Sequence, residues 1–133
     1  MIEISINSSK HFEMIDITEE VRKVVRNSGI KEGICFLYVP HTTAGITVNE
    51  DADPAVRNDL ISFFQKLVPW NGDYSHMEGN SAAHILSTLV GVRMEIPVEE
   101  GNLHLGRWQG VFFCEFDGPR RRNVEVTIME VGK

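Results

Sequence analysis

Residues 40–60 read PHTTAGITVNEDADPAVRNDL, and they separate a predicted strand from a predicted helix. The run before them, ICFLYV at residues 34–39, is almost unbroken in apolar side chains, which is typical of a strand buried on both faces. After them, Asp53 can accept hydrogen bonds from the free amides of a helix, and Pro54 suits the first helical position. The polar residues between the two elements are therefore the first candidates for a functional site.

The size and composition of the chain indicate one compact globular domain over residues 1–133, with 42% hydrophobic and 24% charged residues. No apolar run approaches the roughly 18 residues that a membrane span needs, and no signal-peptide pattern is visible, so we expect a cytoplasmic protein without a membrane partner. Cys35 and Cys114 lie in apolar strand-like runs, which predicts buried, reduced thiols. The net charge of −6 disfavours binding to nucleic acid.

Hydrophobic periodicity predicts strands at both ends of the chain, with helices between them. Alternation over residues 2–6 predicts a half-buried strand, and residues 12–17 are its predicted hairpin partner. Thr18 can cap a first helix, which Gly29 ends. The remaining predicted elements are helices over residues 54–68 and 81–90 and strands over residues 92–96, 103–105, 108–116 and 123–131. This order favours an α+β fold with antiparallel sheets and about three helices.

Three histidines stand out. His41 follows the strand at residues 34–39, His76 lies in a long loop, and His84 lies on the polar face of the helix at residues 81–90. Imidazole ligates divalent metals and also acts as an acid or base near neutral pH. The spacing matches neither a zinc finger nor a zincin helix. The alternative is that each histidine is an ordinary surface or hydrogen-bonded residue.

A carboxylate cluster ends the first stretch, with Glu50, Asp51 and Asp53 beside Asn49. Such hard oxygen ligands suit Mg²⁺ or Ca²⁺, and a carboxylate can also serve as a general base. Asp53 is better explained as a helix cap, and Asp51 as a solvated side chain. Glu50 and Asn49 are the stronger functional candidates, because strand alternation from Thr47 turns at least one of them inward.

Two segments are candidates for binding a small anion. Thr42 and Thr43 offer hydroxyls shortly before Gly45, although they form no Walker loop. Residues 120–122 are three consecutive arginines in an otherwise acidic chain, and arginine pairs with phosphate through two parallel hydrogen bonds. A solvated turn is the alternative for this run. The rigid turn before it can nevertheless aim at least Arg120.

Trp108 and Gln109 form a third candidate for ligand binding. A tryptophan ring offers a flat apolar surface on which a heteroaromatic ring could stack, and the neighbouring amide can hydrogen-bond to it. A core tryptophan is the equally good alternative.

Three segments of the chain resemble the YjbQ-like family. They are residues 40–60, HMEGNSAAHILSTLVG at residues 76–91 and IPVEEGNLHLGRWQGVFFCEFDGPRRR at residues 96–122. The match runs in one colinear order from about residue 9 to the end. It departs from the family pattern at Arg107, where the motif often has threonine, so a role for that hydroxyl does not carry over.

The resemblance implies a compact α+β fold with a β-sandwich-like core, assembled as a homotrimer with clefts between subunits. It also implies secondary thiamine-phosphate synthase activity, in which a pyrimidine diphosphate and a thiazole phosphate are joined and pyrophosphate is released. By motif, the implied catalytic residues are His41, Glu50 and His84. The implied ligand-binding residues are Thr42, Thr43, Asn49, Trp108, Gln109 and Arg120. The divalent metal would be zinc at His41, His76 and His84, or magnesium with the diphosphate.

Two other functions remain open at this point. The first is a trimer that binds a metal or an anion without catalysis, since no pair of nucleophile and base is evident. The second is a zinc-assisted hydrolase, with Glu50 as general base.

Overall fold

The structure of the protein, a computed structural model, describes residues 1–132. These residues form three helices and eight strands, and every strand pair is antiparallel. In chain order the elements are β1 (Ile2–Asn7), β2 (Glu13–Asp16), α1 (Thr18–Ser28), β3 (Gly33–Tyr38), β4 (Ala44–Glu50), α2 (Pro54–Leu67), α3 (Ser81–Val90), β5 (Arg93–Glu99), β6 (Asn102–Leu103), β7 (Gln109–Glu115) and β8 (Arg121–Glu130). The predicted α+β fold is confirmed.

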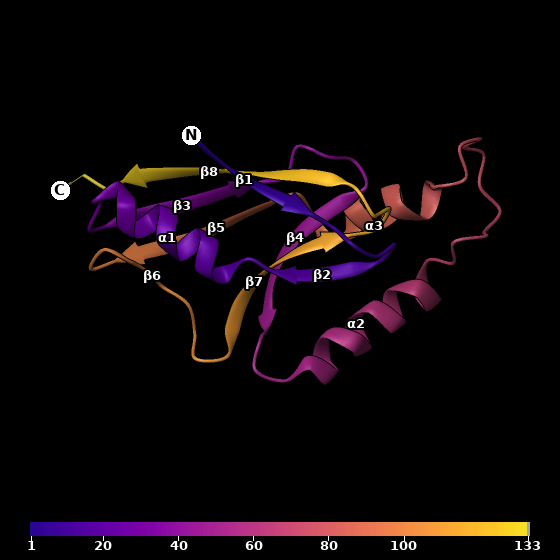
Figure 1. Cartoon of the computed structure of the whole chain (residues 1–133), viewed down its shortest axis with the longest axis horizontal. Coiled ribbons are helices and arrows are strands. Elements are labelled where there is room, and N and C mark those ends of the chain that lie inside the picture. The colour runs from indigo at the N-terminus through magenta and orange to yellow at the C-terminus, as the bar shows by residue number, and fades with distance from the viewer. Residues whose placement is uncertain (133) are drawn as a thin grey trace.

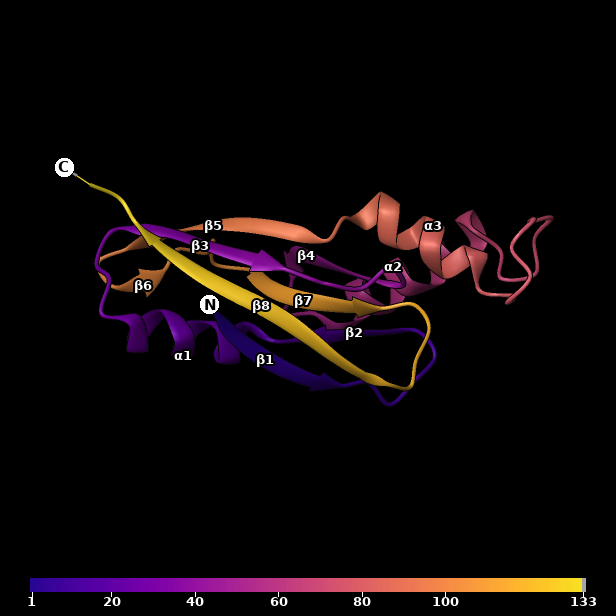
Figure 2. The same cartoon turned by 90° about the horizontal axis from the view of Figure 1, so that it is seen from above.

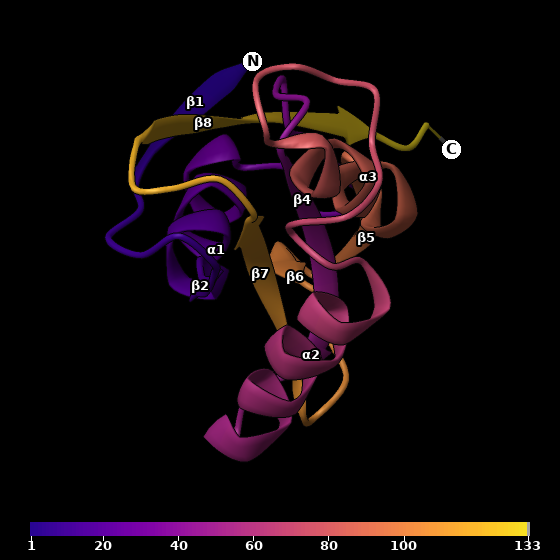
Figure 3. The same ribbon diagram turned by 90° about the vertical axis from the view of Figure 1, so that its right-hand side faces the viewer.

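The strands form two sheets that pack on one another. The first has five strands in the order β1-β8-β3-β5-β6, and the second has three in the order β2-β7-β4. Strands β4 and β7 run across the direction of β8, so the two sheets are crossed rather than aligned (Figure 3). Helix α1 lies beside the five-stranded sheet, whereas α2 and α3 lie together at the other end of the molecule (Figures 1 and 2).

Strand β7 is the centre of the molecule because it is buried on both faces. Alternate residues point to opposite faces of a strand. Val111 and Phe113 belong to the core shared with the five-stranded sheet and α1. Phe112 and Cys114 belong to the core shared with α2 and α3. The three-stranded sheet is therefore the middle layer, with the other sheet and α1 on one side and two helices on the other.

The prediction that residues 34–39 form a strand buried on both faces is wrong. Cys35 and Leu37 are fully buried, but Ile34 and Tyr38 are 37% and 41% exposed. Strand β3 lies in the five-stranded sheet, and among residues 1–132 other elements cover only the inner face of this sheet. An unbroken apolar run does not reveal whether a second layer covers its outer face.

The predicted hairpin between residues 2–6 and 12–17 is also wrong. Strand β2 pairs with β7, so that Glu13 lies opposite Glu115. Strand β1 pairs instead with β8, so that Ile2 lies opposite Val126. The short connection between the first two strands therefore passes from one sheet to the other, which alternation along the sequence cannot detect.

The predicted helix ends agree with the structure except at Thr18. The side chain of Asp53 accepts a hydrogen bond from the amide of Ala55 at 2.9 Å, which caps α2 as predicted. Gly29 ends α1 in the left-handed region, with a φ of 71°. Thr18 is the first helical residue and not the cap. Its hydroxyl donates to Oδ1 of Asp16 and accepts from the amide of Val111, and it thereby joins α1 to β7.

Both cysteines are free and fully buried, as predicted. Burial raises the pKa of each thiol, Cys35 and Cys114, to about 12, so neither forms a thiolate near neutral pH. Within residues 1–132, no helix is long and apolar enough to cross a membrane.

A buried ion pair joins the end of β7 to the start of β8. Glu115 is fully buried and Arg122 is 3% exposed. The Nε of Arg122 donates to Glu115 Oε1 at 2.9 Å, and its Nη2 donates to the other carboxylate oxygen. Each member of the pair is also hydrogen-bonded to another segment of the chain. Arg122 donates to the hydroxyl of Thr43, and Glu115 accepts from the hydroxyl of Ser8 at 2.7 Å. Four separate segments of the chain thus meet at one pair of charges.

The first prediction concerns this pair. Glu115→Gln keeps the side-chain shape but leaves Arg122 as an uncompensated buried charge, which should lower the free energy of unfolding by about 3–5 kcal/mol. Urea denaturation measures this change. Glu130→Gln, at an exposed position of β8, is the control and should change stability by less than about 0.5 kcal/mol. Equal stability of both variants would show that the pair does not support the fold.

Candidate functional site

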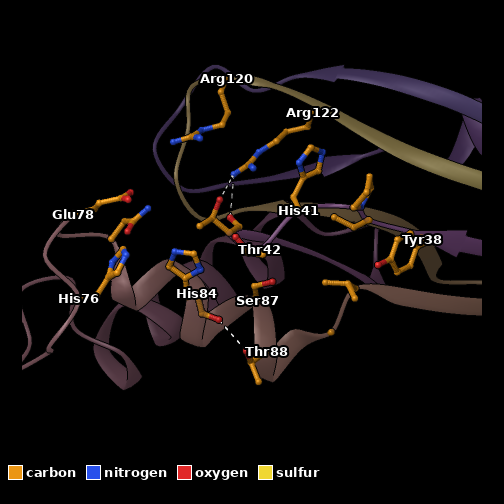
Figure 4. Close-up of a pocket in the computed structure, with 16 residues that line it drawn as sticks. Tyr38, His41, Thr42, His76, Glu78, His84, Ser87, Thr88, Arg120 and Arg122 are labelled. Carbon is orange, nitrogen blue, oxygen red and sulfur yellow. Dashed lines mark hydrogen bonds between the residues drawn. The ribbon is translucent and has the colours of Figure 1, made fainter.

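A cavity of about 1110 Å³ lies beyond the end of β3, between the loop that follows this strand, helix α3 with its preceding loop, and the turn from β7 to β8. Figure 4 shows that side chains from all three segments face it. Tyr38 and the residues just after β3 form one part of its wall. The polar residues of the lining include His41, Thr42, His76, His84, Arg120 and Arg122.

His41 is held by the backbone of the neighbouring strand. Strand β3 ends at Tyr38, opposite Glu125, whereas β8 extends further and begins at Arg121. The amide of Asn123 therefore has no partner from β3, and it donates to Nε2 of His41 at 3.0 Å. The imidazole thus supplies the acceptor that a longer β3 would have offered to the amide of Asn123.

Burial lowers the pKa of His41 below its usual value, and the guanidinium of Arg122 lowers it further. The carboxylate of Glu115 acts to raise the pKa of His41, but the net shift of this pKa is still downward. We therefore expect the imidazole to be neutral at pH 7.

The two threonines after His41 differ in their contacts. Thr43 is 5% exposed, and its hydroxyl and carbonyl oxygens accept hydrogen bonds from Nη2 of Arg122 at 2.8 and 3.1 Å. Thr42 is exposed and lines the cavity. Of the two predicted anion-binding hydroxyls, only that of Thr42 is therefore free of this internal network.

His84 lies in the first turns of α3, with Ser87 and Thr88 one turn further along the cavity wall. Its ring packs edge-to-face against that of His76, with 5.3 Å between the ring centres. The loop before α3 therefore folds back along this helix, so that His76 lies beside His84 (Figure 4). Ser87 anchors this helix, because its hydroxyl donates to the carbonyl of Ala44 at 2.6 Å.

Arg120 is positioned by Asp117, three residues earlier in the same turn. Its Nε donates to the carbonyl of Asp117 at 2.8 Å, and its Nη2 donates to Oδ2 at 3.0 Å. The same carboxylate oxygen accepts from Nδ2 of Asn80 at 3.0 Å, just before α3. Asp117 therefore links two walls of the cavity, while the side chain of Arg120 stays half exposed.

The other predicted site residues lie at the far end of the three-stranded sheet. Ala44 is opposite Glu115 near the cavity, whereas Glu50 is opposite Gln109 at the other end of β4. A strand of seven residues spans about 20 Å. Within one chain, Asn49, Glu50, Trp108 and Gln109 are therefore separated from the cavity that contains His41.

These distant residues make local contacts. The side chain of Asn49 accepts from the amide of Glu50 at 2.7 Å, and that of Gln109 accepts from the amide of Gly106 at 2.8 Å. Trp108 is 55% exposed, so it is not a core residue, and the guanidinium of Arg107 stacks over its ring at 4.8 Å.

The predicted three-histidine metal site is not formed in the described part of the chain. Among residues 1–132, no group of three histidine, cysteine, aspartate or glutamate side chains is placed to hold a metal ion. Nε2 of His41 already accepts a hydrogen bond from a backbone amide, and the charges of Arg122 and Arg120 oppose a further cation at this ring. The donors therefore do not fit a three-histidine zinc site. His76 and His84 alone remain close enough to act together.

Sequence reasoning missed three residues of the site. Tyr38 was assigned to a buried strand, although it lines the cavity. Asp117 begins the turn before the three arginines, and its spacing of three residues from Arg120 is the signal that could have shown their contact. Glu115 was not singled out, because nothing in the sequence shows that Arg122, seven residues later, turns back to it.

Comparison with known proteins identifies the family. The family model described as "UPF0047 protein YjbQ-like" matches residues 2–131. UPF0047 protein MJ1081 of Methanocaldococcus jannaschii is 49% identical over 97% of this chain and 94% of its own length. UPF0047 protein YugU of Bacillus subtilis is also 49% identical, over 95% of this chain and 96% of its own length. The chain therefore belongs to the YjbQ-like (UPF0047) family.

Solved structures of relatives share the fold. An uncharacterised YjbQ/UPF0047 protein of Clostridium acetobutylicum superposes with a TM-score of 0.95, at 50% identity and with 97% of this chain and 100% of that chain covered. A protein of Sulfolobus solfataricus, described as being of unknown function, superposes with a TM-score of 0.94 at 34% identity, covering 98% of this chain and 96% of that chain. The relatives thus define the family and the fold, and leave the reaction open.

The second prediction concerns the pH dependence of stability. Burial alone would raise the pKa of Glu115, but hydrogen bonds from Arg122 and Ser8 outweigh it and hold this pKa below its ordinary value of 4.5. A depressed carboxylate pKa stabilises the folded state above the unfolded-state pKa, and this contribution is lost as the pH falls through the folded-state pKa. The stability difference between the native chain and Glu115→Gln should be constant from pH 8 to about pH 5 and shrink below about pH 4.5.

Urea unfolding at a series of pH values checks this expectation, and comparing the two proteins cancels the titration of the other carboxylates. A difference that grows on acidification would contradict the assigned direction of the shift.

Proposed function

We propose that this protein is an enzyme that binds a small phosphorylated substrate in the cavity beside β3, with its phosphate against Arg120. The observation that carries the proposal is the half-exposed guanidinium of Arg120, which Asp117 orients toward a cavity that also contains histidine and threonine donors. Guanidinium groups pair with phosphate with high directionality. The charged side chains of the lining are Arg120, Arg122 and Glu78. In a chain with a net charge of −6, the two arginines make their side of the cavity the favoured place for an anion.

We further propose thiamine-phosphate synthesis as the activity to be measured, in the cytoplasm. The resemblance to the family suggested this reaction, and the cavity is compatible with it. The thiazole nitrogen would form a bond to the exocyclic methylene carbon of the pyrimidine diphosphate. The carbon–oxygen bond to the diphosphate would break, and its electron pair would leave with pyrophosphate. The substrate supplies the nucleophile, so no nucleophilic side chain is needed.

In such a reaction the protein contributes position and charge. Arg120 would bind the leaving pyrophosphate, and Thr42 would donate a hydrogen bond to one of its oxygens. Magnesium bound to the diphosphate would neutralise more of its charge. Glu50 lies at the far end of β4, so within one chain it is too far from the cavity for any of these tasks.

Tyr38 is the aromatic residue that could contact a substrate ring in this cavity. It is 41% exposed and lies in a part of the wall away from Arg120 (Figure 4). Trp108 was the predicted stacking surface, but within one chain it lies at the other end of the sheet. A substrate with a phosphate at one end and a planar ring at the other would match these positions.

A second copy of the chain could bring the distant residues back to the cavity, and we propose a homotrimer for this reason. The outer face of β3 presents Ile34, Phe36 and Tyr38, and Met129 of β8 lies opposite Ile34. Ile34 and Met129 are 37% and 47% exposed. An apolar sheet face of this kind favours contact with another subunit. Because Tyr38 also lines the cavity, that subunit would lie close to the site.

Metal binding is the second candidate function, with zinc-assisted hydrolysis as its catalytic form. The edge-to-face pair of His76 and His84 favours it, because two adjacent imidazoles are a common part of a metal site. A complete site would need further ligands from the substrate, water or another subunit.

The third prediction tests the proposed enzyme. Arg120→Ala should lower kcat/KM for thiamine-phosphate formation about tenfold or more, because a hydrogen-bonded charge pair with the phosphate is lost. Released pyrophosphate and thiamine phosphate are both measured. Arg121→Ala, at an exposed position of β8 outside the cavity lining, is the matched control and should keep its activity.

Equal activity of the two variants would contradict the phosphate site at Arg120. Hydrolysis of phosphoesters that a chelator abolishes, without synthesis, would favour the second candidate instead.

The fourth prediction tests the assembly. Light scattering should give three times the chain mass of 15.0 kDa. Ile34→Glu places a charge on the apolar face and should shift the protein toward the single-chain mass. Met77→Glu, in a loop where the side chain is 97% exposed, is the control and should leave the mass unchanged. A single-chain mass for the unmodified protein would contradict the trimer.

A further inference from the structure

The hydrogen bond between β8 and His41 determines which ring nitrogen of His41 carries its proton. The amide of Asn123 donates to Nε2 at 3.0 Å. A backbone amide can only donate, so Nε2 must accept with its lone pair and cannot carry a hydrogen. In a neutral imidazole one nitrogen accepts and the other is protonated. The proton of His41 is therefore on Nδ1.

The surroundings of His41 favour the neutral ring. Protonation of Nε2 would break the hydrogen bond to the amide of Asn123 and place a cation beside Arg122. Arg120 lies on the same side of the cavity and adds to the repulsion, whereas Glu115 is the one acidic group that acts in the opposite direction on His41. The carboxylate of Glu115 is already bonded to Arg122 and Ser8. It is therefore not available as a hydrogen-bond acceptor for an imidazolium.

We propose that His41 is a fixed Nδ1–H donor that binds an oxygen atom of the ligand, and that it is not a metal ligand. A histidine binds a metal through a nitrogen lone pair, with the proton on the other nitrogen. The Nε2 lone pair of His41 is used by Asn123, and Nδ1 has its proton in place of a lone pair. The three histidines of the cavity thus have two separate tasks.

The second task belongs to His76 and His84. Their rings contact one another, and none of the backbone amides that donate to side chains in residues 1–132 donates to either ring. A divalent metal in this cavity would bind to that pair, and His41 would donate from another part of the wall. The assignment of the bound oxygen to a phosphorylated ligand rests on the proposed function. The position of the proton on His41 does not depend on that function.

The tautomer can be measured directly in the full chain labelled with ¹⁵N. Two-bond proton–nitrogen correlation spectra at pH 7, without any ligand, should show His41 with a protonated Nδ1 and an unprotonated Nε2. His104, which is exposed and 3.3 Å from a carboxylate oxygen of Glu99, serves as an internal reference outside the cavity. A His41 ring protonated at Nε2, or at both nitrogens, would overturn the proposal.

Zinc titration tests the division of tasks. His41→Gln retains a side-chain oxygen that can accept from Asn123, and its zinc affinity should stay within about twofold of the native chain. His76→Ala and His84→Ala should each weaken zinc binding at least tenfold. Thermal unfolding of each variant confirms that it is folded. A folded His41→Gln chain that loses zinc as strongly as His84→Ala would overturn the proposal.

Inorganic pyrophosphate is the probe for the donor role. It should shift the Nδ1–H resonance of His41, and His41→Leu, which has no donor, should bind pyrophosphate about tenfold more weakly than the native chain. Pyrophosphate that binds with the same affinity to a folded His41→Leu chain would overturn the donor role. The absence of pyrophosphate binding to the native chain would contradict the proposed function, whereas the tautomer is decided separately by the ligand-free spectra.

Discussion

The cavity depends on the buried ion pair between Arg122 and Glu115. The arginine binds the Thr43 turn and the glutamate binds Ser8 and the amide of Asp117, so the pair holds together the loop before β4, the end of β1 and the turn from β7 to β8. A buried ion pair is seldom more stabilising than apolar packing, because both charges lose their hydration. Its contribution here is to hold these loops in one arrangement, since the hydrogen bonds of both charged groups come from these loops and from each other.

The site also depends on two neighbouring strands of unequal length. Because β3 ends at Tyr38 while β8 continues, one edge of β8 is left with an unpaired amide beside the cavity. His41 satisfies this amide with its side chain, and the chain then turns away toward β4. The end of a strand thus provides both the opening for a cavity and a rigid position for a histidine, which agrees with the general tendency of binding residues to lie on loops held by a rigid scaffold.

The polar residues of the family motifs form two groups rather than one. His41, Thr42, His76, His84 and Arg120 meet at the cavity, whereas the group around Glu50 and Trp108 lies about 20 Å away along β4. The exposed outer face of β3 lies beside the cavity, and it is the surface at which another subunit could rejoin the two groups. Within the cavity group, the neutral ring of His41 is assigned to binding the ligand. The contacting rings of His76 and His84 are the pair that a metal would bind.

The sequence by itself determined the local features of this protein. The bounds of α3, the cap at Asp53 and the end of α1 at Gly29 could all be predicted, because each depends on residues within one or two turns of chain. The order of the predicted strands and helices favours the α+β class with antiparallel sheets, which the structure confirms.

Only the tertiary structure decided which segments meet. The pairing of β2 with β7, the exposure of one face of β3, and the separation of Glu50 from His41 all depend on contacts between residues far apart in the sequence. The partners of Arg122 and the tautomer of His41 depend on such contacts as well. Periodicity along a strand shows which side chains share a face, but it does not show what covers that face or which strand lies beside it.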